Sequence, residues 1–146
     1  MIVKSKFRVI EILVCMVLTA FAILCIGGNE AYGATELASG SCGAEGSDLT
    51  WTMSSAGVLT ISGSGDMEKY DLPGEGGLSA PWSAFKNSIY TVTVEEGVTS
   101  IGDYAFYSYE NLIVVELPAS LTKIGSSAFE WCTKIVVVNI EDLANW

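Results

Sequence analysis

The side chains that could do chemistry in this chain are mainly carboxylates, because the sequence contains no histidine. Without an imidazole, His-dependent triads, Cys–His nucleophiles and imidazole metal sites are excluded. The adjacent pair Glu95 and Glu96 could provide an acid and a base for glycoside cleavage. Neighbouring residues on a strand point to opposite faces, however, and this pair directly precedes Gly97 in an expected turn. We therefore interpret both side chains as solvated turn carboxylates.

A second group of carboxylates lies in the glycine-rich segment 63–80. Asp66, Glu68 and Asp71 are spaced as calcium ligands could be. The alternating acidic ligands, central glycine and terminal glutamate of a calcium loop are missing, which favours a solvated loop. The run Gly63–Gly65 is too short to indicate a nucleotide site. We therefore expect no catalytic residue, no metal and no cofactor.

The elements that would position these residues are set by a repeat with a period of 23 residues. Val98–Phe106 returns as Leu121–Phe129. A fixed period in this range predicts a solenoid, in which each unit buries its apolar face against its neighbours. The same register recurs at Ile89, Leu112 and Ile135, at Val92, Val115 and Val138, and at Val94, Leu117 and Ile140.

Each repeat is predicted to contain the same parts. A short strand comes first, at 90–94, 113–117 and 136–140, and a second extended piece follows at 98–101 and 121–124. Gly102 and Gly125 come next, where we expect a positive φ. A single helical turn around Phe106 and Phe129 closes the unit. The expected fold is therefore a mainly β solenoid with short strands and single helical turns.

The first 33 residues have the three-part pattern of a secretory signal peptide. A basic start (Lys4, Lys6, Arg8) precedes an apolar run of residues 12–26, and small residues flank a cleavage site before Ala34. The alternative is a membrane anchor, but a helix of this length spans about 22 Å against a hydrocarbon core of about 30 Å. We expect a secreted protein that contacts the membrane only through this segment, before cleavage.

The charge of the remaining chain indicates which partners are excluded. Without residues 1–33, 4 basic and 15 acidic residues remain, a formal net charge of −11. Such a surface repels nucleic acid and anionic lipid, so neither is expected as a partner. We interpret the negative net charge as a means of keeping the protein soluble outside the cell.

Two cysteines, Cys42 and Cys132, also remain. They could form a disulfide in an oxidising compartment. Cys132 occupies the repeat position that Tyr109 fills one unit earlier, which indicates a buried packing role. Because Cys42 lies at the opposite end of the expected solenoid, we favour two separate thiols.

Residues 34–88 are expected to form an amino-terminal cap ahead of the repeats at 89–146. Segment 34–47 is small and polar and is interpreted as a leader. Two alternating runs, 49–53 and 58–62, are joined by a short turn containing glycine, which is typical of a β-hairpin. After the loop at 63–80, Trp82 and Phe85 return two aromatic rings to the core.

The repeat residues resemble the BspA-type leucine-rich repeat. The resemblance is carried by Ile101–Phe106 followed by Asn111–Pro118, and by Ile124–Cys132, while segments 40–51, 59–65 and 80–82 resemble the cap that often precedes such repeats. It implies an extracellular or cell-surface leucine-rich-repeat protein, with adhesion as a frequent role and no catalysis by the repeat. The chain holds about two and a half repeats, so we interpret it as a fragment of a longer protein. If it is not one, the edge at 136–140 could support self-association.

Strand alternation predicts the binding surface. Because Val92, Val115 and Val138 point inward, the residues between the inward positions must face out of the sheet. Val114 and Val137 are apolar where a polar residue is expected, which indicates a contact patch, although β-propensity alone would also explain valine. We expect a non-catalytic adhesion module for a protein or glycan; the alternative is a structural spacer or cap of a larger secreted or wall-associated enzyme. The outward columns are Thr91, Val114 and Val137, and Thr93, Glu116 and Asn139.

Overall fold

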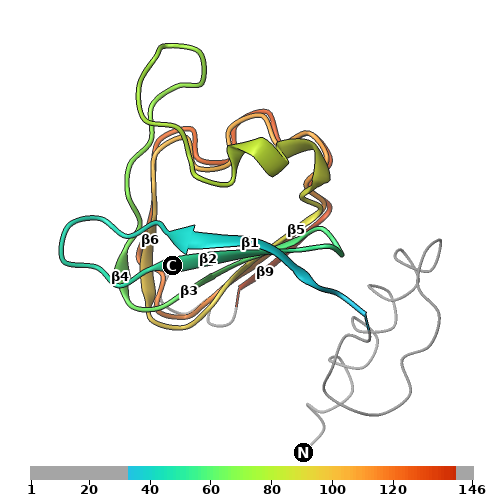
Figure 1. Ribbon diagram of the computed structural model, residues 1–146. Coiled ribbons are helices and arrows are strands. Elements are labelled where there is room, and N and C mark those ends of the chain that lie inside the picture. Colours follow the sequence, from blue (N-terminus) through green and yellow to red (C-terminus); the bar gives the residue numbers. More distant parts are fainter. Residues whose placement is uncertain (1–32, 141–146) are drawn as a thin grey trace, which may run out of the picture. The chain divides into compact units, whose positions relative to one another are not determined.

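The computed structural model describes residues 33–140 (Figure 1). The expected signal peptide lies outside these residues, apart from Gly33. No helix between residues 33 and 140 is both long and apolar enough to span a bilayer. The described chain winds into stacked coils, and the view in Figure 1 looks along the stack from the side of strand β1.

A six-stranded sheet forms one wall of the stack. The first three strands are antiparallel, and from β3 onward each strand pairs parallel with the next coil. The predicted repeat strands are confirmed, each starting one residue later than expected. In spatial order the strands are β1 (Glu36–Ser41), β2 (Thr50–Ser54), β3 (Val58–Ser62), β5 (Thr91–Val94), β7 (Val114–Leu117) and β9 (Val137–Ile140).

A second, three-stranded parallel sheet forms another wall. It consists of β4 (Gly65–Asp66), β6 (Val98–Ile101) and β8 (Lys123–Ile124). The second extended pieces of the repeat are therefore confirmed, although the piece expected at 121–124 is shortened to β8. A 3₁₀ helix, η1 (Ser83–Ser88), and the repeat turns lie across the remaining side in Figure 1.

The helical turns expected around Phe106 and Phe129 are wrong, because these segments are successive tight turns. Two residues there are left-handed, with φ of 55° at Tyr104 and 59° at Ser108, which is incompatible with a regular helical turn. The N–H groups of every second residue point along the stack instead of along a helix axis. Bonds to the next coil result: Tyr104 N–H to the Ser126 carbonyl (3.0 Å), Phe106 to Ala128 (2.8 Å) and Ser108 to Glu130 (2.7 Å).

The positive φ expected at Gly102 and Gly125 is also wrong. Gly102 is needed because the backbone of the cap loop passes against it, and a Cβ there would overlap the Glu68 carbonyl oxygen. A Cβ on Gly125 would collide in the same way with the backbone of Asp103 in the preceding coil. Both positions therefore require glycine, because the neighbouring backbone passes too close to leave room for a Cβ.

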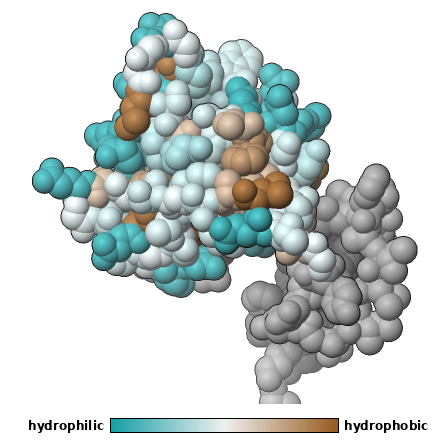
Figure 2. Space-filling view, viewed as in Figure 1, coloured by the Kyte–Doolittle hydropathy of each residue, from teal (hydrophilic) through white to brown (hydrophobic). Residues whose placement is uncertain are grey.

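The cap is larger than the expected hairpin. The hairpin of β2 and β3 is confirmed, but the segment interpreted as a leader forms β1, which pairs antiparallel with β2. The loop at 63–80 is likewise more than solvated chain, since β4 adds to the smaller sheet and Met67 and Tyr70 are buried. Figure 2 shows the surface on this side, where hydrophilic residues predominate and apolar ones gather in small groups, as a capping unit requires.

Aromatic rings fill the centre of the stack. Phe106 lies between the rings of Trp82 (centroids 5.4 Å apart, planes at 19°) and Phe129 (5.1 Å, 14°). The Trp82 indole N–H donates to the Ala105 carbonyl one coil further on, at 3.0 Å. Stacked rings at this spacing contribute beyond their buried area, so the ladder ties the cap to the repeats.

The two cysteines are separate free thiols, as expected. Burial raises the pKa of the Cys42 thiol to about 12, so it stays protonated at neutral pH. Cys132 is half-buried, and its Sγ lies 3.0 Å from the Phe106 carbonyl oxygen. A thiol contact therefore substitutes for the fully buried Tyr109 ring at the equivalent position of the preceding coil.

A carboxylate in the smaller sheet gives a prediction about pH. Thr99 donates a 2.6 Å hydrogen bond to Asp66, and bonds from Thr99 and then Ser100 lower the pKa of that carboxyl below its ordinary value. A lowered folded-state pKa stabilises the fold above the ordinary value and ceases to do so as the pH falls through the folded value. Thr99→Val should therefore lower the urea midpoint slightly at pH 7 and less at pH 2.

The control for this prediction is Thr122→Val. The Thr122 hydroxyl donates to the Thr99 carbonyl at 3.1 Å, so its loss removes a hydrogen bond of the same sheet without touching a carboxylate. Its effect on the urea midpoint should be the same at both pH values. A Thr99→Val effect equally independent of pH would show that the Asp66 contact does not stabilise the charged form.

Candidate functional site

The outward face of the larger sheet holds the residues expected to bind. The pairing places Thr91, Val114 and Val137 in one column, and Thr93, Glu116 and Asn139 in the next. Inward alternation is as expected at Val92 and Val115, which are buried, whereas Val138 in the last described strand is 53% exposed. Val114, on strand β7 between β5 and β9, is only 8% exposed, because its neighbours in the column flank it on both sides.

Sequence reasoning missed a third column at the entry to these strands. Tyr90, Ile113 and Val136 precede the strands and are joined coil to coil, with Ile113 N–H donating to the Tyr90 carbonyl (2.8 Å) and Val136 N–H to Ile113 (3.0 Å). Tyr90 is 44% and Val136 is 72% exposed. With Val114 and Val137 these residues form what we call the apolar strip. The sequence could have indicated this column, because an apolar residue recurs at this position in all three coils.

A polar column borders the apolar strip. The Thr93 hydroxyl donates to a Glu116 carboxylate oxygen at 2.9 Å, which fixes that carboxylate on the sheet face. The column continues into the cap, because Thr60 pairs with Thr93 and Thr52 pairs with Thr60. The site therefore offers an apolar surface beside a row of hydroxyl and carboxylate groups.

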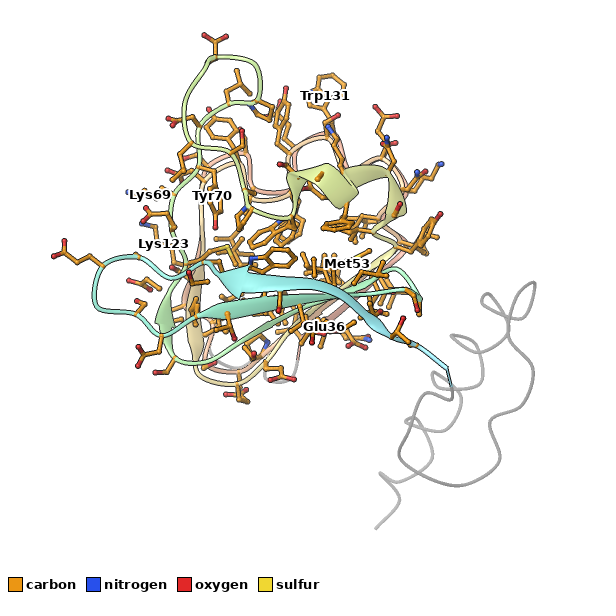
Figure 3. All side chains as sticks on the ribbon, in the orientation of Figure 1. Glu36, Met53, Lys69, Tyr70, Lys123 and Trp131 are labelled. Atoms are coloured by element: carbon orange, nitrogen blue, oxygen red, sulfur yellow. The ribbon has the colours of Figure 1, made fainter. Side chains whose placement is uncertain are left out.

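The sheet face is anionic. Its six strands contain Glu36 and Glu116 and neither lysine nor arginine. The basic residues of the described chain lie elsewhere: Lys69 in the cap loop, Lys86 in η1, Lys123 in β8 and Lys134 ahead of β9. Figure 3 places Lys69 and Lys123 on the side of the smaller sheet.

Of the other carboxylates considered from sequence, some accept backbone hydrogen bonds and others are exposed. Glu95 and Glu96 are both exposed, and Glu96 accepts a 2.6 Å hydrogen bond from the Ala119 backbone N–H of the next coil. Asp71 accepts a 2.7 Å bond from the Leu78 N–H within the cap loop. Within residues 33–140 no three potential metal ligands come together.

Parallel strands stacked at a fixed period, with one exposed face, define a leucine-rich repeat solenoid. Residues 78–145 match the family described as BspA type leucine rich repeat region (6 copies), so this part of the chain is similar to repeats of that family. The chain is also similar to a leucine-rich repeat protein from Eubacterium ventriosum, with 32% identity and a TM-score of 0.60 over 71% of this chain. The match covers 26% of that protein, so the chain spans about a quarter of its length.

A second solved structure, a leucine rich cell surface protein from Faecalibacterium prausnitzii, is 20% identical with a TM-score of 0.38. That match covers 69% of this chain and 32% of the other. No curated protein matches the chain.

Proposed function

We propose that the chain is a non-catalytic binding module of a secreted or cell-surface protein, which holds a protein ligand on the outward face of its larger sheet. The observation that carries this proposal is the apolar strip, which continues through three strands in register and leaves Tyr90 and Val136 substantially exposed. Exposed apolar surface beside polar groups is typical of interaction sites. Adhesion to a protein surface is the role that this arrangement supports.

The chemistry of the strip favours a protein over a glycan. Sugar rings are usually held against flat aromatic rings, and the strip offers Tyr90 as its one aromatic among aliphatic side chains. Valine and isoleucine contribute through burial against other apolar groups, at about 25 cal/mol per Å². A protein segment can supply such groups together with partners for the polar column.

Replacing Val114 and Val137 together by threonine tests the proposal. Threonine keeps the branched shape and the β-propensity of valine but adds a hydroxyl, which lowers stability somewhat at the largely buried Val114, so the melting temperature is measured together with binding. We expect peptides selected from a phage-displayed library on the wild-type chain to bind the double variant about tenfold more weakly. Titration of the recovered peptides by isothermal calorimetry measures this difference.

The matched control is Ile124→Thr, because Ile124 is also an exposed apolar strand residue but belongs to the smaller sheet. Selected peptides should bind this variant as well as wild type. Peptides that bind the double variant without loss would contradict the sheet face as the contact surface. The repeats would then be better explained as a structural spacer within a longer surface protein.

A further inference from the structure

A hollow lies on the outward face of the cap strands, next to the first repeat strand. It has a volume of about 130 Å³ and opens beside β1, β2 and β3. Its lining combines one carboxylate and three hydroxyl side chains with apolar surface, and it adjoins the apolar strip because Val58 pairs with Thr91 in the first outward column. The lining residues are Glu36, Thr52, Met53, Ser54, Val58 and Thr60.

A β-bulge places the only carboxylate of this hollow. Ala38 pairs with Met53, so regular alternation would set Leu37 opposite Ser54 and turn Glu36 toward the core. The register instead shifts between Glu36 and Ala38, and Glu36 lies opposite Ser54. Bulges commonly re-aim one side chain in this way. Figure 3 shows Glu36 on the opposite side of the sheet from the core residue Met53.

The Glu36 carboxylate is available to a ligand. Among residues 33–140 it has no hydrogen-bond or ion-pair partner, and the residue is exposed. The hydroxyl groups of Thr52, Ser54 and Thr60 line the same hollow and can accept hydrogen bonds from a cation. The six strands of the sheet contain no basic residue that could neutralise it.

We propose that this hollow receives a lysine or arginine side chain of an extended partner segment, whose apolar residues lie along the strip. The proposal rests on the proposed function, because it names the partner chemistry of the same sheet face. Charge complementarity selects the occupant: an anionic hollow continuous with an apolar strip fits a basic residue followed by apolar ones. Neighbouring strands are about 4.8 Å apart, so the row from Glu36 to Val137 spans about 24 Å, or about seven extended residues.

The probe is a synthetic peptide, acetyl-Lys-Ser-Leu-Ser-Leu-Ser-Leu-amide, titrated against the chain expressed in full with its own leader. Amide chemical shifts of the protein report binding even in the millimolar range. Glu36→Gln should weaken the lysine peptide about three- to fivefold, as expected for an exposed ion pair, and should reduce the salt dependence of binding. A peptide with glutamine in place of lysine should bind wild type and Glu36→Gln equally.

The controls separate this proposal from the function on which it rests. Glu130→Gln removes one exposed carboxylate on the turn side and should leave both peptides unaffected. The Val114→Thr and Val137→Thr double variant should weaken both peptides alike. If the valine double variant binds the peptides more weakly but Glu36→Gln binds them as wild type does, the cation site is overturned and the sheet-face function stands. If the lysine peptide produces no shifts at millimolar concentration, or binds Glu36→Gln as it binds wild type, the cation site is wrong.

Discussion

Gly102→Ala is expected to lower the free energy of unfolding by about 3 kcal/mol, at the upper end of the cost of overpacking. The added methyl group would overlap the Glu68 carbonyl oxygen, and a backbone atom cannot turn aside as a flexible side chain can. The cap loop is held against this part of the first coil by the Tyr70 N–H, which donates to the Asp103 carbonyl at 3.1 Å. For a domain of this size such a loss should lower Tm by more than about 10 °C.

Gly76→Ala is the control for this substitution. Gly76 has a positive φ of 78°, but a Cβ there would meet no atom within 4 Å. Its replacement should therefore cost only the strain of a left-handed residue, about 1 kcal/mol. Urea denaturation of both variants gives the comparison. Equal losses would show that the cap loop moves away from Gly102 without penalty, and that the cap and the first coil are not rigidly packed.

The regular part of the fold could be predicted from sequence because each coil repeats the same environment. Val92, Val115 and Val138 recur at one spacing, and the parallel pairing places them in register. The pattern therefore determined both the strand positions and the side that faces the core. Alternation then correctly gave the two outward columns of the candidate site.

The irregular parts depend on contacts between segments that sequence periodicity does not show. Residues 36–41 are poor in β-formers, and they form β1 because β2 offers an unpaired edge of the cap. Gly102 resembles a turn glycine in sequence, but the reason for it is the backbone of a loop more than 30 residues earlier. Such requirements appear only when the coils are stacked.

The candidate site was predicted in position but not in extent. Val114 is apolar and faces out, yet its exposed fraction is set by Thr91 and Val137 on the adjacent strands. Tyr90 was expected within a strand that in fact starts one residue later, and it was not included in either outward column. The hollow beside Glu36 escaped prediction because a bulge reverses the direction of that side chain.

Phe106→Ala is expected to have the largest effect, a loss of about 3–5 kcal/mol in the free energy of unfolding. Phe106 is fully buried, and its ring separates Trp82 of the cap from Phe129 of the last described coil. Truncation removes both stacking contacts and leaves a cavity in the middle of the stack. Domains are stable by only about 5–15 kcal/mol, so much of the population could unfold on mild heating.

Phe129→Ala provides the matched comparison, because Phe129 stacks on Phe106 but is only half-buried. Among residues 33–140 its ring has one aromatic neighbour, whereas Phe106 stacks between two. We therefore expect Phe129→Ala to lower the free energy of unfolding by about half as much as Phe106→Ala. Urea denaturation measures this loss, and near-ultraviolet circular dichroism, to which Trp82 contributes, reports on the packing of the rings. Equal losses would mean that the second face of Phe129 is covered in the folded protein by something beyond these residues. A small loss for Phe106→Ala would contradict the aromatic ladder as the link between cap and repeats.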